Sequence, residues 1–211
     1  MSLTCLAIAF SALVSTLAAA PASSPDRGKP DDGRSKIEAY LATHDVASTA
    51  ELDGLMKAPE NALMAIASDG HVVGLTRARA VAALRLVPSH SVQAFLLKLV
   101  QSNAKATDAT DRLLVRRAAV VLGWMAGAGS AEKLALLFDN DDAEVRLDAA
   151  IGIGLTRAET AATLLHRQLA VESIPKVRDQ IERQLRALGS APVEPEKSQP
   201  PKKVEPMRAG W

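Results

Sequence analysis

The feature that most constrains the fold of this chain is a ten-residue segment of helical pattern that occurs four times. The copies are TRARAVAALR, LVRRAAVVLG, VRLDAAIGIG and VRDQIERQLR, which begin at Thr76, Leu114, Val145 and Val177. Their starts are 38, 31 and 32 residues apart, and each period accommodates two helices and two turns. The fifth and ninth places of each copy are small or apolar, and we expect them to be buried: Ala80, Ala118, Ala149, Ile181, Leu84, Leu122, Ile153 and Leu185.

A second apolar stretch of helical spacing follows each of the first three copies, over residues 91–100, 130–138 and 158–169. Each stretch carries two apolar residues four places apart, which predicts one buried helix face: Leu96 with Val100, Leu134 with Phe138, and Leu165 with Leu169. Residues 102–111 are polar and predict a loop insertion that lengthens the first period. A single hairpin cannot bury its apolar face, so the hairpins are expected to stack.

Two segments, LLVRRAAVVLGWM and DDAEVRLDAAIGIGLTRAETAATLL, resemble HEAT repeats of the short bacterial type, which also occur in phycobilisome-lyase-like proteins. Val145 and Arg146 match the Val-Arg start of that pattern, Ala149 matches its fifth place, and residues 152–154 match its small and apolar end. The resemblance implies an all-α fold, a short right-handed α-solenoid of about four to five stacked helical hairpins.

The likeness to HEAT repeats varies along the chain. It is good over residues 114–189, partial over 70–100 and poor before that. Arg85 and Arg186 stand where the family pattern has glycine, so the helices are expected to end differently there. Within the pattern, Gly152 and Gly154 are interpreted as places of close helix packing.

The first part of the chain is typical of an exported bacterial protein. Residues 1–20 carry no charged side chain and end in small residues, which predicts a signal peptide and a periplasmic or secreted location. An uncleaved N-terminal membrane anchor is the alternative. Residues 21–34 are rich in Pro, Gly, Ser and Asp and predict a disordered linker.

The folded part is expected to be a HEAT-like array over residues 35–189. Residues 35–70 should form an irregular cap of two or three helices, and residues 71–189 the repeats. Residues 190–211 contain five prolines and predict a disordered tail, with the Pro-Pro-Lys-Lys of residues 200–203 as a candidate recognition peptide for another protein.

The pattern indicates no catalytic, cofactor-binding or metal-binding residues. Cys5, the only cysteine, lies in the predicted signal peptide, and the four histidines are far apart with no metal-ligand spacing. The acidic run at residues 139–144 has oxygen ligands suited to calcium, but it lacks the glycine and distal glutamate of a calcium loop. A turn with a helix N-cap explains it better. We therefore expect a protein that is not an enzyme.

Four arginines recur near the starts of the predicted first helices: Arg77, Arg116, Arg146 and Arg178. They are interpreted either as a basic ridge for an anionic partner or as structural residues paired with nearby acids. Acidic residues lie a few places before each one, which favours the structural interpretation. The formal net charge of +1 also argues against general attraction to nucleic acid or to an anionic membrane.

The exposed side of the second helices lines the concave face in HEAT-like arrays, and this face is the predicted partner-binding surface. Its candidate residues are Lys98, Glu132, Lys133, Thr163, His166 and Arg167. Trp124 is a further candidate, either as an exposed anchor for a partner or as a core residue between units. The leading hypothesis is an exported scaffold that binds a protein partner. The alternatives are an enzyme or enzyme accessory similar to phycobilin lyases, and a structural component of the cell envelope.

Overall fold

The computed structural model describes residues 32–44, 48–125 and 129–189. This part of the chain is all-helical, as predicted: it contains ten α-helices and two short 3-10 helices, η1 and η2, and no strand. The predicted signal peptide, the tail and nearly all of the predicted linker lie outside these ranges.

Three helices form the N-terminal part: α1 (Asp32–Thr43), α2 (Thr49–Leu55) and α3 (Glu60–Ser68). Their number agrees with the cap expected over residues 35–70. Helix α1 begins at Asp32, three residues before the start at residue 35 that was predicted for the folded part. Ser48 and Glu51 form a reciprocal capping box at the start of α2, in which each side chain bonds the backbone N–H of the other residue. This cap explains why so short a helix begins there.

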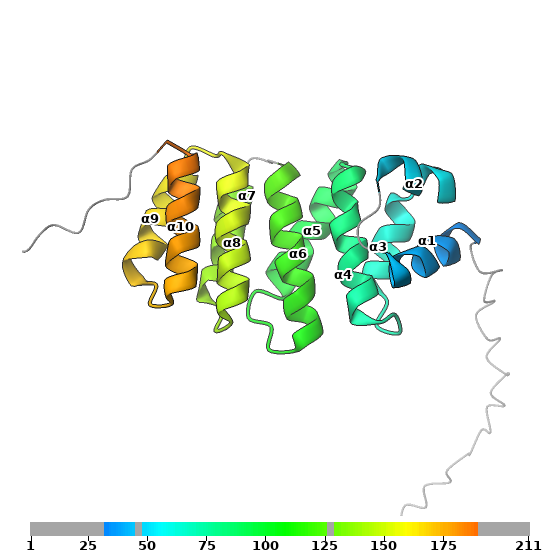
Figure 1. Ribbon diagram of the computed structural model, residues 1–211, viewed down its shortest axis with the longest axis horizontal. Helices are drawn as coiled ribbons and strands as arrows, with labels where there is room; N and C mark the ends of the chain where they lie inside the picture. Colours follow the sequence, from blue (N-terminus) through cyan, green and yellow to red (C-terminus); the bar gives the residue numbers. More distant parts are fainter. Residues whose placement is uncertain (1–31, 45–47, 126–128, 190–211) are drawn as a thin grey trace, which may run out of the picture. The chain divides into compact units, whose positions relative to one another are not determined.

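The four repeated segments lie in α4 (Gly74–Ala83, continued by η1, Leu84–Leu86), α6 (Ala109–Met125), α8 (Ala143–Thr156) and α10 (Pro175–Ala187). These helices pack side by side in chain order and form the first-helix row (Figure 1). All eight residues expected to be buried at the fifth and ninth places are fully buried. The predicted loop at residues 102–111 is shorter than expected, because α6 begins at Ala109.

The second-helix row consists of α3, α5 (His90–Ser102), α7 (Ser130–Ala135) with η2 (Leu136–Asp139), and α9 (Ala161–Val171). Each of these helices contacts a helix of the first-helix row and its own neighbours along the chain. Leu96, Leu134, Leu165 and Val100 are fully buried, as predicted.

Two residues expected on the buried face of the second helices are only partly buried, namely Phe138 and Leu169. Leu137 and Gln168, one place earlier, are buried instead. For Leu137 the reason is the tighter 3-10 turn of η2, which places residues three apart on the same side. The hydrogen bond that Gln168 donates to Glu172 offsets the cost of burying its polar side chain.

Helices α6 and α8 approach most closely at Gly123 and Gly152. A Cβ atom added to Gly123 would lie 2.4 Å from the carbonyl oxygen of Gly152, and one added to Gly152 would lie 2.5 Å from the carbonyl oxygen of Ala119. No Cβ atom is tolerated at such distances without a shift of backbone. The interpretation of Gly152 as a place of close helix packing is therefore confirmed.

This contact predicts that Gly152→Ala lowers the free energy of unfolding by about 1–3 kcal/mol, because α6 and α8 must separate to admit the methyl group. Gly54→Ala is the matched control. Gly54 lies inside α2 with no atom within 4 Å of an added Cβ, so alanine should stabilise this variant by about 0.5–1 kcal/mol. Urea denaturation measures both. If both variants changed the free energy of unfolding equally, the close contact of α6 and α8 at Gly152 would be refuted.

Candidate functional site

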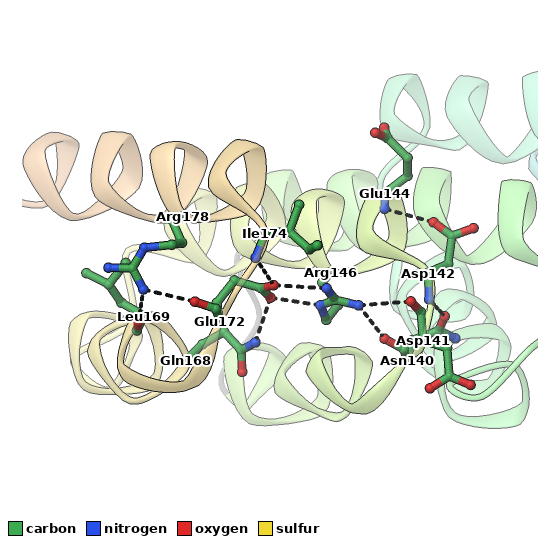
Figure 2. Close-up of polar contacts among 10 residues, drawn as sticks. All are labelled: Asn140, Asp141, Asp142, Glu144, Arg146, Gln168, Leu169, Glu172, Ile174 and Arg178. Carbon is green, nitrogen blue, oxygen red and sulfur yellow. Dashed lines mark hydrogen bonds and ion pairs between the residues drawn. The ribbon is translucent and has the colours of Figure 1, made fainter.

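The most extensively bonded polar group in the described part of the chain is a buried ion pair between Arg146 of α8 and Glu172, just after α9 (Figure 2). Arg146 donates from Nε and Nη2 to the two carboxylate oxygens at 2.8 and 2.9 Å. Its Nη1 atom donates to the backbone oxygens of Asn140 and Asp141 at 2.9 and 3.0 Å. The side chain of Arg146 is 13% exposed and that of Glu172 is 2% exposed. Arg146 thus joins the segment after η2 to the segment after α9.

Glu172 accepts further hydrogen bonds from the Gln168 side chain and the Ile174 backbone N–H, each at 3.0 Å. The bonds from Arg146 above all, together with those from Ile174 and Gln168, lower the pKa of Glu172 from its usual value near 4.5 to about 2. The carboxylate is therefore ionised at every ordinary pH and has a structural role.

Three other arginines bond backbone oxygens near the end of the preceding segment. Arg77 donates to Ala67 at 3.0 Å, Arg112 to Ala106 at 3.1 Å, and Arg178 to Leu169 at 2.8 Å. Ala67 and Leu169 lie in the last turns of α3 and α9, where carbonyl oxygens lack partners within the helix, so Arg77 and Arg178 satisfy them and complement the helix dipole. Ala106 lies in the loop after α5, so Arg112 fixes this loop against α6. Sequence reasoning missed Arg112, because α6 begins a turn earlier than the repeat pattern.

Arg116 differs from the other recurrent arginines, because it reaches sideways to α8 and pairs with Asp148 at 2.7 Å and Glu144 at 3.1 Å. Burial raises the pKa of Asp148, and the hydrogen bond from Arg116 opposes that effect. All four recurrent arginines therefore make structural bonds, which supports the structural interpretation over a basic ridge for an anionic partner.

The acidic run at residues 139–144 is a turn and helix N-cap. The Asp142 side chain accepts a hydrogen bond from the backbone N–H of Glu144 at 2.8 Å and begins α8. Its other carboxylate oxygen lies 3.4 Å from Arg112. Across residues 32–44, 48–125 and 129–189, no group of three His, Cys, Asp or Glu side chains is placed to hold a metal ion.

The candidate residues of the second helices lie on three helices. Lys98 is on α5, Glu132 and Lys133 are on α7, and Thr163, His166 and Arg167 are on α9. All are exposed except His166, which is half-buried.

One groove brings two of these candidates together. It has a volume of about 280 Å³ and lies between α7 with η2 and α9. Its lining includes Glu132, Leu136, Phe138, Leu164 and Arg167. Lys98, Lys133, Thr163 and His166 are outside its lining.

The groove is lined by two acids, Glu132 and Asp139, by one base, Arg167, and by apolar side chains. The Thr160 hydroxyl donates to the Glu132 carboxylate at 2.6 Å and lowers its pKa, so Glu132 is held against the start of α9. Arg167 makes no ion pair with any described residue. Leu136 is 45% exposed, and sequence reasoning missed it. The available signal was the run Leu134, Leu136, Leu137, which has more leucines than one helix stripe can bury.

Trp124 is 62% exposed near the C-terminal end of α6, so it is not a core residue between units. It lies on the first-helix row, whereas the other candidates lie on the second-helix row. Two shallow hollows share Trp124 and Arg85 as lining residues. The candidate residues therefore divide between two separate surfaces.

No described helix is both long and apolar enough to cross a membrane. Comparisons of the chain with protein-family models, with curated proteins and with solved structures found no match.

The pKa of Glu172 predicts the pH dependence of stability. Its folded value of about 2 lies below the unfolded value near 4.5, so the ionised pair contributes stability above pH 4.5 and loses it as the pH falls toward 2. Glu172→Gln should lower the free energy of unfolding by about 3 kcal/mol at neutral pH, and the difference from the parent should shrink toward pH 2.

Glu144→Gln is the control for this measurement. Its carboxylate is 39% exposed and pairs with Arg116 and Lys176, so its loss should cost less than about 1 kcal/mol. Chemical denaturation at several pH values measures both variants. If the difference in unfolding free energy between Glu172→Gln and the parent stayed constant down to pH 2, the assignment of this pH dependence to Glu172 would be wrong.

Proposed function

We propose that this chain is an exported, non-enzymatic scaffold with HEAT-like solenoid architecture that binds a protein partner through the second-helix row. The period of 31 to 32 residues between the later copies supports the repeat architecture. The side-by-side packing of α4, α6, α8 and α10 supports it as well. Export is proposed from the uncharged, apolar first twenty residues.

The observation that carries the binding proposal is the groove between α7 with η2 and α9. Its apolar lining includes Leu136, Phe138 and Leu164, and charged residues flank them. An exposed apolar surface with a polar rim is typical of a protein interaction site. Its volume of about 280 Å³ is at the lower limit for a small-molecule site, and it suits one large side chain of a partner better.

The charges of the groove indicate which partner segment fits. Arg167 offers a cation with no ion-pair partner in the described part of the chain, and of the two lining acids, Glu132 and Asp139, Glu132 is already bonded to Thr160. We therefore infer a partner segment that inserts an aliphatic or aromatic side chain against Leu136 and places a carboxylate near Arg167. An amphipathic helix with an acidic residue one turn from its apolar anchor has this arrangement.

The test is Leu136→Glu, which places a carboxylate on the apolar lining of the groove. A photo-crosslinking residue at position 133, beside the groove, should capture one partner in the native envelope fraction. Leu136→Glu should reduce that crosslink at least about tenfold, the effect of losing an interface anchor worth 1.4 kcal/mol or more. The amount of each crosslinked product is measured after denaturing electrophoresis.

Leu75→Glu is the matched control. Leu75 is 49% exposed, close to the 45% of Leu136, but it lies on α4 in the first-helix row. Its crosslink yield should equal that of the parent, and both variants should keep the parent melting temperature. Equal crosslinking in all three proteins would refute the second-helix row as the binding surface.

A further inference from the structure

A groove unrelated to the proposed partner site runs along the first-helix row between α4 with η1 and α6. Two adjoining hollows of about 200 and 390 Å³ form it. Arg117, Val120 and Trp124 of α6 line it on one side, at the spacing of one helix face, and Arg85 and Pro88 line it on the other. Trp124 and Arg85 are common to both hollows, so the groove is continuous at its centre.

The charge of this groove is positive, with Asp148, the ion-pair partner of Arg116, also interacting electrostatically with Arg117. Arg85 and Arg117 are exposed, and neither forms an ion pair with a residue that the structure describes. Two cations beside an exposed indole suit a ligand with carboxylates on both sides of an apolar group. Proline is such a group, because aromatic-lined grooves bind proline-rich segments in the polyproline II form.

The chain itself carries that arrangement in its C-terminal tail. Residues 193–196 read Val-Glu-Pro-Glu, with one glutamate on each side of Pro195. The remaining charges of the tail are mainly basic, so this acidic pair is the part of the tail that complements Arg85 and Arg117.

The tail is long enough to reach the groove. Figure 1 shows α6, α8 and α10 running in the same direction, so the ends of α6 and α10 lie at the same end of the row. Packed helix axes are 8–10 Å apart, which places α6 about 16–20 Å and the groove between α4 and α6 about 20–25 Å from α10. Glu194 and Glu196 are five and seven residues beyond Gly189. An extended chain of ~3.3–3.6 Å per residue covers about 16–25 Å over that length.

We propose that residues 193–196 of the tail dock into this groove of the same chain. Pro195 lies against the Trp124 indole, and the two glutamates pair with Arg85 and Arg117. The docked tail covers the most exposed aromatic side chain that the structure describes, on the row opposite the proposed partner site.

The test uses the fluorescence of Trp124 in the purified full chain. Trp211→Phe removes the only other tryptophan and leaves Trp124 as the sole reporter. In this background, Glu194→Gln with Glu196→Gln should shift the Trp124 emission to longer wavelength. The ratio of docked to open tail should fall about two-fold or more, as expected for the loss of two exposed ion pairs, and acrylamide quenching should rise accordingly. High salt should have the same effect on the parent.

Glu205→Gln is the matched control, because Val204-Glu205-Pro206 repeats the Val-Glu-Pro sequence in a basic part of the tail. It should leave emission and quenching unchanged. A charge exchange, Arg117→Glu with Glu196→Arg, should restore the protection that Arg117→Glu alone removes.

Three results would overturn the proposal. The first is unchanged quenching in the Glu194→Gln, Glu196→Gln chain, and the second is an equal effect of Glu205→Gln. The third is protection that increases with protein concentration, which would assign the groove to the tail of a second copy. All substituted positions in the folded part are exposed, so an unchanged melting temperature confirms that the comparison reports docking and not unfolding.

Discussion

The ion pair between Arg146 and Glu172 is the interaction on which the spacing of the last units depends. Two charges removed from water are favourable only when nearly all of their hydrogen-bonding capacity is satisfied. Here the partners come from the segment after η2, from α8, from the end of α9 and from the start of α10. A shift of any one of these segments would leave a buried charge without its bonds, so the pair holds the four segments in one arrangement.

Packing acts together with this polar constraint. Gly123 and Gly152 let α6 and α8 meet backbone to backbone, and the fully buried alanines of the repeat keep the remaining helices close. The core is aliphatic, built from Leu, Ile, Val and Ala, and aromatic residues make up only 3% of the chain, so an exposed tryptophan is unusual here. Trp124 and Leu136 are exposed on different rows, which separates the groove at Trp124 from the groove at Leu136.

Much of the fold followed from periodicity. The helices of the repeats and their fully buried fifth and ninth places were predicted because a repeated 3.6-residue pattern leaves few alternatives. Errors occurred at boundaries: α1 and α6 begin earlier than expected, and η2 changes which residues of the second helix are buried. For the candidate site, the exposure of Lys98, Glu132, Lys133, Thr163 and Arg167 was predictable. It was not predictable that Glu132 and Arg167 line a groove whereas the other three lie on open surface.

The sequence by itself determined the helical class, the buried places and the structural character of the recurrent arginines, because these depend on local spacing and on the charge of near neighbours. Only the tertiary structure decided that Glu172 pairs with Arg146, 26 residues earlier, and that Arg85 lies beside Trp124. Both depend on how the helices are placed against one another. That placement is set by close contacts such as Gly123 with Gly152, whose distances no one-dimensional pattern contains.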